Sequence, residues 1–588
     1  MDRKLVFFFI AIYSIVAGLG YFLSVDTSVE ESAAVEITTS YIVQGESLES
    51  VAALVRAAGG EVTHELGVIR AVGATLTQAQ ANVLRTHSDV QRLYGNGSIE
   101  VAAKGSTGGG NDPNGDGGNG GNGIQETHYP TTVLANNLHT SGIDGSGVGI
   151  AILDTGLWKH DGIKYDSAGN ARMRVVYNAI SNEVAVNPMN GNDQGGHGSH
   201  VASIAVSSLV TENGNYNGIA PGAHLISVQA FDELGQGTYA DVIRAIDWVV
   251  ANKAAHNIRV LNLSFSAEPR SHYWDDPINQ AVMVAWQQDI VVVAAAGNRG
   301  PAAMTIGVPG NVPYVITVGA MTDNYTEDNE GDDFVASFSS AGPTYEGFVK
   351  PEVVVPGGHM LGLMPSQSHL ATTYPEFYAG DKYFQMSGTS QAAGVVSGVA
   401  ALILQANPGL SADDVKCTIM ATARPAVEGK GKNISLAYSV FQQGAGLVDA
   451  TAAATMPVAD CANQGLDIDA DIAGTRHFGG RANQDANGNF YVMGSDLTAS
   501  DGYTWDESYS SSSGYMWTNG YMWTNGYMWT NGYLWTNGSV NSDGYMWTNG
   551  YMWTNGYMWT NGYMWTNGYM WTNALTEMAS MSSWVNQE

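Results

Sequence analysis

Continuous apolar runs alternate with amphipathic segments between residues 124 and 456. Five runs rich in Val, Ile, Leu and Ala show no polar alternation, which is typical of strands covered on both faces. These runs are residues 148–153, 225–228, 260–264, 290–295 and 314–318. Together with the helical segments between them they predict an α/β domain, with a parallel sheet and helices on both faces. Ligand-binding and catalytic groups are expected where such strands end.

A second alternation of strand and helix signals precedes this domain. The strand signals fall at residues 39–43, 61–66, 68–72 and 90–94, and the helix signals at 48–58 and 77–85. The order β-α-β-β-α-β predicts a small α+β unit of the ferredoxin-like kind within residues 26–105. Residues 106–123 consist almost only of Gly, Asn and Asp, so we expect a flexible linker there.

The first 25 residues combine a basic start with an apolar run. Arg3 and Lys4 precede residues 5–23, which are almost entirely apolar. This pattern predicts export, and hence a secreted or extracellular protein. The run is long for a signal-peptide core and just long enough to span a bilayer, so a cleaved signal peptide, which we favour, and an uncleaved membrane anchor both remain open. The anchor would attach the protein to the cell surface.

Charge and cysteine content narrow the class of protein. The 588 residues carry 55 acidic against 24 basic side chains, a formal net charge of −31, so nucleic acid is not an expected partner. The only two cysteines, Cys417 and Cys461, exclude a disulfide framework but allow one bridge in an oxidising compartment. That bridge would fasten residues 457–510, an expected small β-rich appendage, to the α/β domain.

Residues 511–588 contain a repeat of the hexapeptide Gly-Tyr-Met-Trp-Thr-Asn. Because a period of six is even, every Tyr and Trp falls on one face of an extended chain, whereas a helix would scatter them. The recurring Asn-Gly predicts a turn between short strands. Both a hairpin meander and a parallel coil fit this pattern. The aromatic row could contact polysaccharide or a cell surface, or the repeat could pack only on itself or stay partly disordered.

Three chemical groups stand at the ends of predicted elements in the α/β domain. Asp154 follows the first strand, His197 opens a helix in His-Gly-Ser-His, and Ser390 stands at the start of a long apolar helix. A serine becomes nucleophilic when an imidazole takes its proton and a carboxylate orients that imidazole. Singly, these residues could also be a turn aspartate, a core histidine and a helix-capping serine. No metal is expected, because His-x-x-His lacks a third ligand in a recognisable spacing.

A fourth residue completes the pattern. Asn298 follows the strand at 290–295, where its amide can donate to a developing oxyanion. With these four residues in this chain order, residues 124–456 resemble the subtilisin family of serine proteases, the subtilases. The resemblance implies that Asp154, His197 and Ser390 form a catalytic triad, and that Asn298 and the backbone N–H of Ser390 form the oxyanion hole.

The same resemblance implies a substrate cleft in which a peptide adds as a β-strand. The implied substrate-binding residues are Gly235, Gly237, Ser264, Phe265, Ser266, Ala295, Ala296 and Gly297. Two positions depart from the family pattern. Gly394 stands where the family usually has proline, which would loosen the turn into the helix, and Ser266 stands where glycine is frequent, which would narrow the pocket for the residue before the scissile bond.

The resemblance therefore implies an exported serine endopeptidase that acts on protein or peptide substrates through an acyl-enzyme on Ser390. No cofactor is required for this chemistry, and a structural calcium ion is compatible with it. The small α+β unit is similar to the inhibitory propeptides of secreted subtilases, which would lay residues 101–104 in the cleft until Ser390 cleaves nearby. The competing hypothesis is a catalytically silent subtilase-fold surface protein that acts in adhesion or polysaccharide binding through its repeats.

Overall fold

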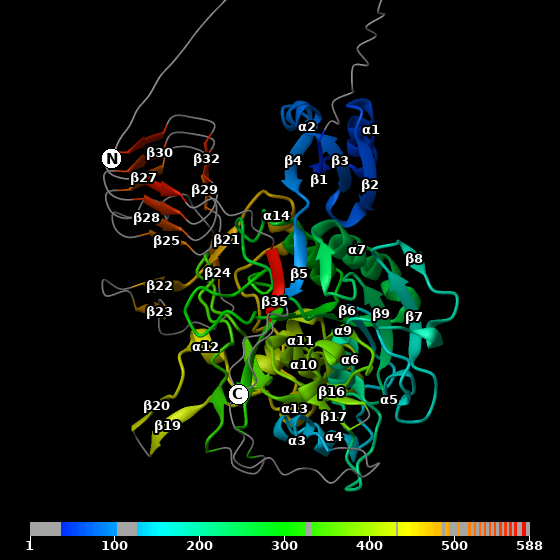
Figure 1. The fold of residues 1–588 in the computed structure, drawn as a ribbon. Helices are drawn as coiled ribbons and strands as arrows, with labels where there is room; N and C mark the ends of the chain where they lie inside the picture. Colours follow the sequence, from blue (N-terminus) through cyan, green and yellow to red (C-terminus); the bar gives the residue numbers. More distant parts are fainter. Residues whose placement is uncertain are drawn as a thin grey trace, which may run out of the picture.

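A computed structural model describes residues 37–102, residues 126–484 apart from 325, 327–330, 381 and 431–432, residues 489–492 and 502–504, and the short strands between 516 and 583 (Figure 1). The predicted signal or anchor segment and the Gly/Asn linker lie outside the described residues. Among the described helices, Thr389–Ala406 (α10) is the one long and apolar enough to cross a membrane, and 89% of it is buried inside the protein. Burial of this kind is typical of the core helix of a soluble domain.

A nine-stranded sheet in the order β14-β13-β12-β11-β6-β9-β7-β8, with β15 beside β13, forms the centre of the molecule. Its parallel strands are β7 (Met173–Asn178), β9 (His224–Gln229), β6 (Gly149–Asp154), β11 (Ile258–Leu263), β12 (Val291–Ala295), β13 (Ile316–Thr322) and β15 (Val353–Pro356). The short strands β8 (Glu183–Val184) and β14 (Phe334–Val335) pair antiparallel at its edges. The five core strands expected from the sequence correspond to β6, β9, β11, β12 and β13.

Helices cover both faces of this sheet (Figure 1). On one face α6 (His197–Val206) packs against α10, which crosses β11, β12, β13 and β15, while α7 (Tyr239–His256) and α8 (Pro277–Gln287) lie on the other. A Cβ on Gly394 would lie 3.0 Å from the carbonyl oxygen of Val201. This glycine therefore lets α10 approach α6 closely, and α10 begins at Thr389.

Smaller elements complete this domain. The short helices are α3 (Tyr129–Thr132), α4 (Asn136–His139), α5 (Asp161–Lys164), α9 (His369–Thr373), α11 (Ala412–Thr422), α12 (Val440–Gln443) and α13 (Ala450–Thr455). The remaining strands are β10 (Gln236–Thr238), β16 (Met360–Leu363), β17 (Tyr378–Ala379), β18 (Tyr383–Met386), β19 (Val427–Lys430) and β20 (Asn433–Leu436).

The N-terminal unit is a four-stranded antiparallel sheet in the order β2-β3-β1-β4 with two helices. Its elements in chain order are β1 (Thr38–Gly45), α1 (Leu48–Ala57), β2 (Glu61–Leu66), β3 (Ala71–Thr77), α2 (Gln78–Arg85) and β4 (Val90–Gly95). Apolar residues of both helices and of the sheet form a separate small core between them.

One predicted strand of this unit was wrong in its placement. Residues 67–69 form a 3-10 turn instead of strand, and β3 begins only at Ala71. The backbone N–H groups of Gly67 and Val68 donate to the carboxylate of Asp247 on α7, at 3.2 and 2.8 Å. This contact with the α/β domain overrides the strand propensity of the Val68 and Ile69 side chains.

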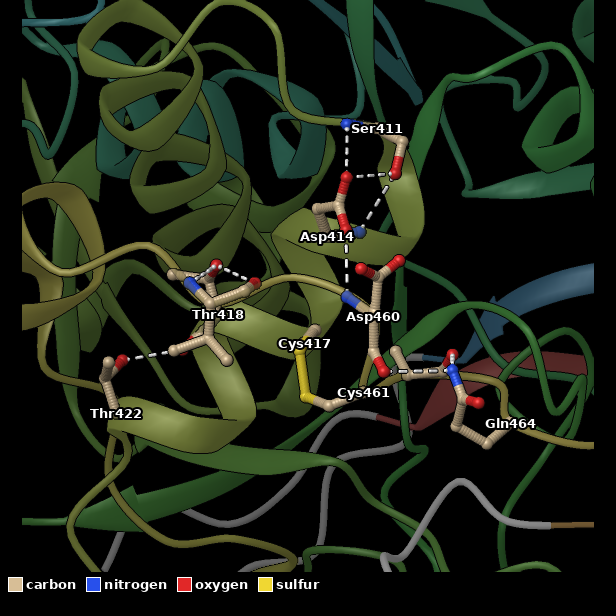
Figure 2. The surroundings of a disulfide bond; sticks show 10 residues. Ser411, Asp414, Cys417, Thr418, Thr422, Asp460, Cys461 and Gln464 are labelled. Atoms are coloured by element: carbon tan, nitrogen blue, oxygen red, sulfur yellow. Dashed lines mark hydrogen bonds between the residues drawn. A yellow bond between two sulfur atoms is a disulfide. The ribbon is translucent and has the colours of Figure 1, made fainter.

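Residues 457–484 contact the α/β domain through a covalent bond and through hydrogen bonds. The bridge between Cys417 on α11 and Cys461, which the sequence left open, is present (Figure 2). Asp471, on the short helix α14 (Ile468–Ile472), accepts hydrogen bonds from the Tyr273 and Tyr314 hydroxyls at 2.6 and 3.1 Å. The expected β-rich character holds for the strands that follow, namely β21 (Phe478–Gly480), β22 (Ala482–Gln484), β23 (Phe490–Val492) and β24 (Gly502–Thr504).

The repeat strands form three parallel sheets. Each strand from β25 (Met516–Thr518) to β31 (Met552–Thr554) pairs in register with the strand three hexads later, so that Trp517 is level with Trp535. The series runs through β26 (Met522–Thr524), β27 (Met528–Thr530), β28 (Leu534–Thr536), β29 (Val540–Ser542), β30 (Met546–Thr548), β32 (Met558–Thr560) and β33 (Met564–Thr566) to β34 (Met570–Thr572). Of the two arrangements left open by the sequence, this is the pairing of a parallel coil.

Candidate active site

The carboxyl end of β6 and the N-terminus of α6 bring Asp154 and His197 together. Nδ1 of His197 lies 2.7 Å from Oδ1 and 2.9 Å from Oδ2 of Asp154, and both side chains are buried. The approach depends on Gly198, because a Cβ there would collide with the carbonyl oxygen of Gly156 in the turn after Asp154. The carboxylate therefore fixes the imidazole with Nδ1–H as the donor, which leaves Nε2 as the basic nitrogen.

Ser390 is the second residue of α10 and is buried. Its hydroxyl donates to the carbonyl oxygen of Ser264 at 2.9 Å, and the hydroxyl of Ser264 donates back to the carbonyl oxygen of Ser390 at 2.9 Å. Within the described part of the chain, Nε2 of His197 has no hydrogen-bond partner. The structure thus pairs Asp154 with His197 directly, while a backbone oxygen holds the serine hydroxyl. Hydrogen bonds of this kind often align only when substrate is bound.

Asn298 lies just beyond β12 and is oriented by Thr389, the residue before Ser390. Its Oδ1 accepts hydrogen bonds from the backbone N–H and from the hydroxyl of Thr389, both at 2.9 Å. Because Oδ1 is the accepting end, Nδ2 is the donor end of this amide, and it lies 3.4 Å from where a Cβ on Gly388 would be. The amide donor is therefore held beside the first residues of α10.

The predicted cleft residues fall on three neighbouring segments. Gly237 lies on β10, which pairs antiparallel with β5 (Ser98–Ala102) from the N-terminal unit. Gly235 lies in the turn before β10, with a φ of 75°, and is therefore not part of that strand. The other predicted residues, Ser264, Phe265, Ser266, Ala295, Ala296 and Gly297, follow the ends of β11 and β12 and are all buried.

Ser266 has an environment that the sequence did not predict. Its hydroxyl oxygen would collide with a Cβ on Gly307 and would lie 2.7 Å from one on Gly297. The side chain is 6% exposed, and among the described residues its Oγ has no hydrogen-bond partner. A polar atom therefore stands between the backbones of Gly297 and Gly307.

Asp193 is a residue that the sequence analysis missed. This carboxylate is 2% exposed and accepts four hydrogen bonds. Its Oδ1 accepts from the Thr155 hydroxyl and the Gly196 N–H, both at 2.8 Å, and its Oδ2 accepts from the N–H and hydroxyl of Ser199 at 2.8 and 2.6 Å. The one sequence signal for it is an aspartate shortly before a helix N-terminus, a common capping arrangement.

The pKa values of the two histidines of α6 are shifted in opposite directions. Burial lowers the pKa of His197, but the charge and hydrogen bond of Asp154 and the charge of Asp193 outweigh this effect and raise it above its usual value. Burial lowers the pKa of His200 to about 4. His200 is therefore neutral near pH 7. Its Nε2–H donates a hydrogen bond to the carbonyl oxygen of Phe384 at 2.9 Å, which is a structural role.

No metal cluster was found in the described part of the chain, where no group of three or more His, Cys, Asp or Glu side chains is arranged to hold an ion. The calcium ion considered from the sequence stays a prediction. The chemistry that the described residues offer is a buried imidazole–carboxylate pair, a serine at a helix N-terminus and an amide donor beside it. That combination serves acyl transfer.

Comparison with known proteins agrees with this chemistry. The model of the subtilase family matches residues 145–446. Serine protease AprX of Bacillus subtilis (strain 168) is 39% identical over 47% of this chain and 60% of its own length, and subtilisin DY of Bacillus licheniformis is 32% identical over 55% of this chain and 96% of its own length. Fervidolysin from Fervidobacterium pennivorans, described as a keratinolytic enzyme related to subtilisin, shares the fold with a TM-score of 0.56 at 21% identity, over 80% of this chain and 67% of its own.

The fold, the site and these matches define a subtilisin-like serine endopeptidase. The chain belongs to the subtilase family. The family model covers neither the residues before 145, which include the N-terminal unit, nor the residues after 446.

Proposed function

We propose that this protein is a secreted endopeptidase that cleaves proteins or peptides through an acyl-enzyme on Ser390, with Asp154 and His197 completing the triad. The observation that carries the proposal is the buried Asp154–His197 pair at 2.7 Å, whose remaining ring nitrogen has no partner in the described residues. A buried basic nitrogen without a hydrogen-bond partner lowers the stability of the fold. The same nitrogen is available to take the hydroxyl proton of Ser390 when the serine attacks a bound substrate.

The mechanism follows from these positions. Oγ of Ser390 attacks the carbonyl carbon of the scissile bond while Nε2 of His197 takes the hydroxyl proton, and Asp154 stabilises the imidazolium that forms. The oxyanion of the tetrahedral intermediate accepts hydrogen bonds from Nδ2 of Asn298 and the N–H of Ser390. His197 then gives its proton to the leaving amine, and water, activated by the same nitrogen, hydrolyses the ester.

The first test is covalent labelling of the processed protein with a fluorophosphonate probe, and the matched control is a Ser390→Ala chain from which added wild-type enzyme has removed the N-terminal unit. Labelling of the wild type and none of the variant supports an activated serine. A folded, processed wild type that stays unlabelled contradicts the proposal and favours the silent, adhesive alternative.

We further propose that the N-terminal unit is an intramolecular inhibitor removed by Ser390. Three contacts support this role. Strand β5 adds antiparallel to β10, with Ile99 opposite Gly237. His64 of the unit lies 3.1 Å from Asp241 on α7, and the N–H groups described above bind Asp247. A strand already added to β10 occupies the edge to which a substrate strand would add.

Processing tests this assignment independently of substrate turnover. A Ser390→Ala chain expressed alone should keep residues 37–102, whereas wild type should lose them. Normal processing of the variant by itself would contradict self-cleavage, and a mature enzyme that is not inhibited by added residues 26–105 would contradict inhibition.

The repeat coil is proposed as a contact region for polysaccharide or a cell surface. The support is register: Trp517, Trp535, Trp553 and Trp571 occupy the same position on successive parallel strands of one sheet. Aromatic rings in such rows suit stacking on sugar rings. Retention on insoluble polysaccharide should fall in a chain truncated after residue 510, and equal retention of both forms would contradict this role. The cut is placed there because residues 457–484 are bound into the catalytic domain.

A further inference from the structure

We infer that Asp193 is a positioning residue for His197: its carboxylate joins the turn that carries Asp154 to the first turn of α6, and its negative charge stabilises the imidazolium formed during the reaction. This inference rests on the proposed function, because it concerns the same histidine. It adds a second acidic group to the three residues that the chain order predicted.

The first support is how α6 begins. The N-cap residue is Gly196, with a φ of 98° and no side chain to accept hydrogen bonds from the first turn. The free N–H groups of a helix N-terminus need acceptors when they are buried. Asp193 accepts from the N–H of Gly196 and from that of Ser199. The direction in which His197 leaves the helix is therefore set by a carboxylate outside the helix.

The second support is the link to Asp154. The Thr155 hydroxyl donates to Asp193 at 2.8 Å and accepts from the N–H of Gly198 at 3.0 Å. The N–H of Thr155 donates to Oδ1 of Asp154 at 2.8 Å. Thr155 thus connects the two carboxylates, through its hydroxyl to Asp193 and to the residue after His197, and through its backbone N–H to Asp154. Movement of Asp193 would change the distance between the two partners of the Asp154–His197 pair.

The third support is the charge around the imidazole. The titratable groups that face His197 are Asp154 from β6, Asp193 from the segment before α6, and His200 from its own helix. Burial raises the pKa of Asp193 above its usual value, and its four accepted hydrogen bonds offset only part of this effect. All four are bonds that the ionised carboxylate accepts, and the positive end of the α6 dipole also favours its charge.

A structural cap and a positioning residue make different predictions. A cap that only holds the helix would lower stability when removed and leave the pH dependence of catalysis unchanged. A charge that acts on His197 must also move the pH at which the imidazole loses its proton. Asp193→Asn separates the two, because an amide keeps the size of the side chain and removes the charge.

The experiment uses the full chain after processing, with kcat/KM for a chromogenic peptide and the rate of fluorophosphonate labelling both measured from pH 4 to 10. Ser199→Ala serves as the matched control, since it removes one hydrogen bond to Asp193 and keeps the charge. We expect Asp193→Asn to lower the midpoint of the acidic limb by about 0.5–1 pH unit and the plateau by about 10-fold. Ser199→Ala should keep the wild-type midpoint.

The outcomes are distinct. A folded Asp193→Asn protein with the wild-type midpoint and plateau overturns the inference, while an unlabelled wild type overturns the proposed function instead. If Asp193→Asn does not fold, Thr155→Val replaces it. This variant keeps the charge of Asp193 and breaks its hydroxyl link to Thr155 and Gly198, so the plateau should fall several-fold at an unchanged midpoint. A wild-type plateau for folded Thr155→Val would overturn the inference.

Discussion

Replacement of Asn298 separates oxyanion stabilisation from the packing of the site. Loss of one donor of an oxyanion hole lowers kcat by about 10²–10³-fold, or roughly 3–4 kcal/mol of transition-state stabilisation. In this protein Asn298→Ala removes a second interaction as well, because Oδ1 accepts the N–H and the hydroxyl of Thr389 at 2.9 Å. Thr389 is fully buried, and a buried donor left without a partner costs about 1–3 kcal/mol.

Asn298→Asp provides the matched control, since its carboxylate still accepts from Thr389 but no longer donates to the oxyanion. We expect both variants to lose kcat with little change in KM, because the donor acts mainly in the transition state. Asn298→Ala should in addition show a lower Tm than Asn298→Asp in calorimetry at neutral pH. Steady-state kinetics on a peptide substrate supply the first comparison. Asn298→Ala with kcat within about 10-fold of wild type would refute the assignment of this amide to the oxyanion hole.

Three further predictions concern other parts of the molecule. His197 acts as a base only when unprotonated and its pKa is raised, so kcat/KM should fall as the pH drops through a midpoint above the ordinary histidine value; a midpoint clearly below that value would contradict the electrostatic argument. Ser266→Gly should raise kcat/KM for peptides with Phe or Leu before the scissile bond by about 10-fold relative to Ala, whereas Ser266→Ala should have a smaller effect; unchanged ratios would mean that the hydroxyl does not limit the pocket. Replacing Cys417 and Cys461 together by Ser should cost about 4 kcal/mol, since the bridge closes a loop of 44 residues; an unchanged denaturation midpoint would contradict this.

The sheet and the residues of the candidate site could be predicted because their signals are local. Strands covered on both faces, such as β6 and β12, read as unbroken apolar runs. Asp154, His197 and Ser390 each stand at an element end that the sequence itself marks. The chain order of these residues carried the family resemblance, and the family match covers all three positions.

The features that escaped prediction depend on partners far away in the sequence. Asp193 matters through Thr155, which lies 38 residues earlier in the chain, and the turn at Gly67 forms against Asp247, 180 residues away. The hydroxyl of Ser390 rests on a carbonyl oxygen 126 residues distant. Periodicity and local propensity contain no information on such contacts.

The bridge between α11 and Cys461 decides how a pulling force on the tail would travel. If the repeat coil is attached to a surface, tension reaches Cys461 along the chain and crosses the sulfur atoms into α11, whose Cys417 is fully buried (Figure 2). The intervening residues are then bypassed. Among them is α13, which packs on α10, the helix that carries Ser390. The covalent shortcut would spare residues 418–460, including α13, and would deliver the tension to α11, which directly follows the helix that carries Ser390.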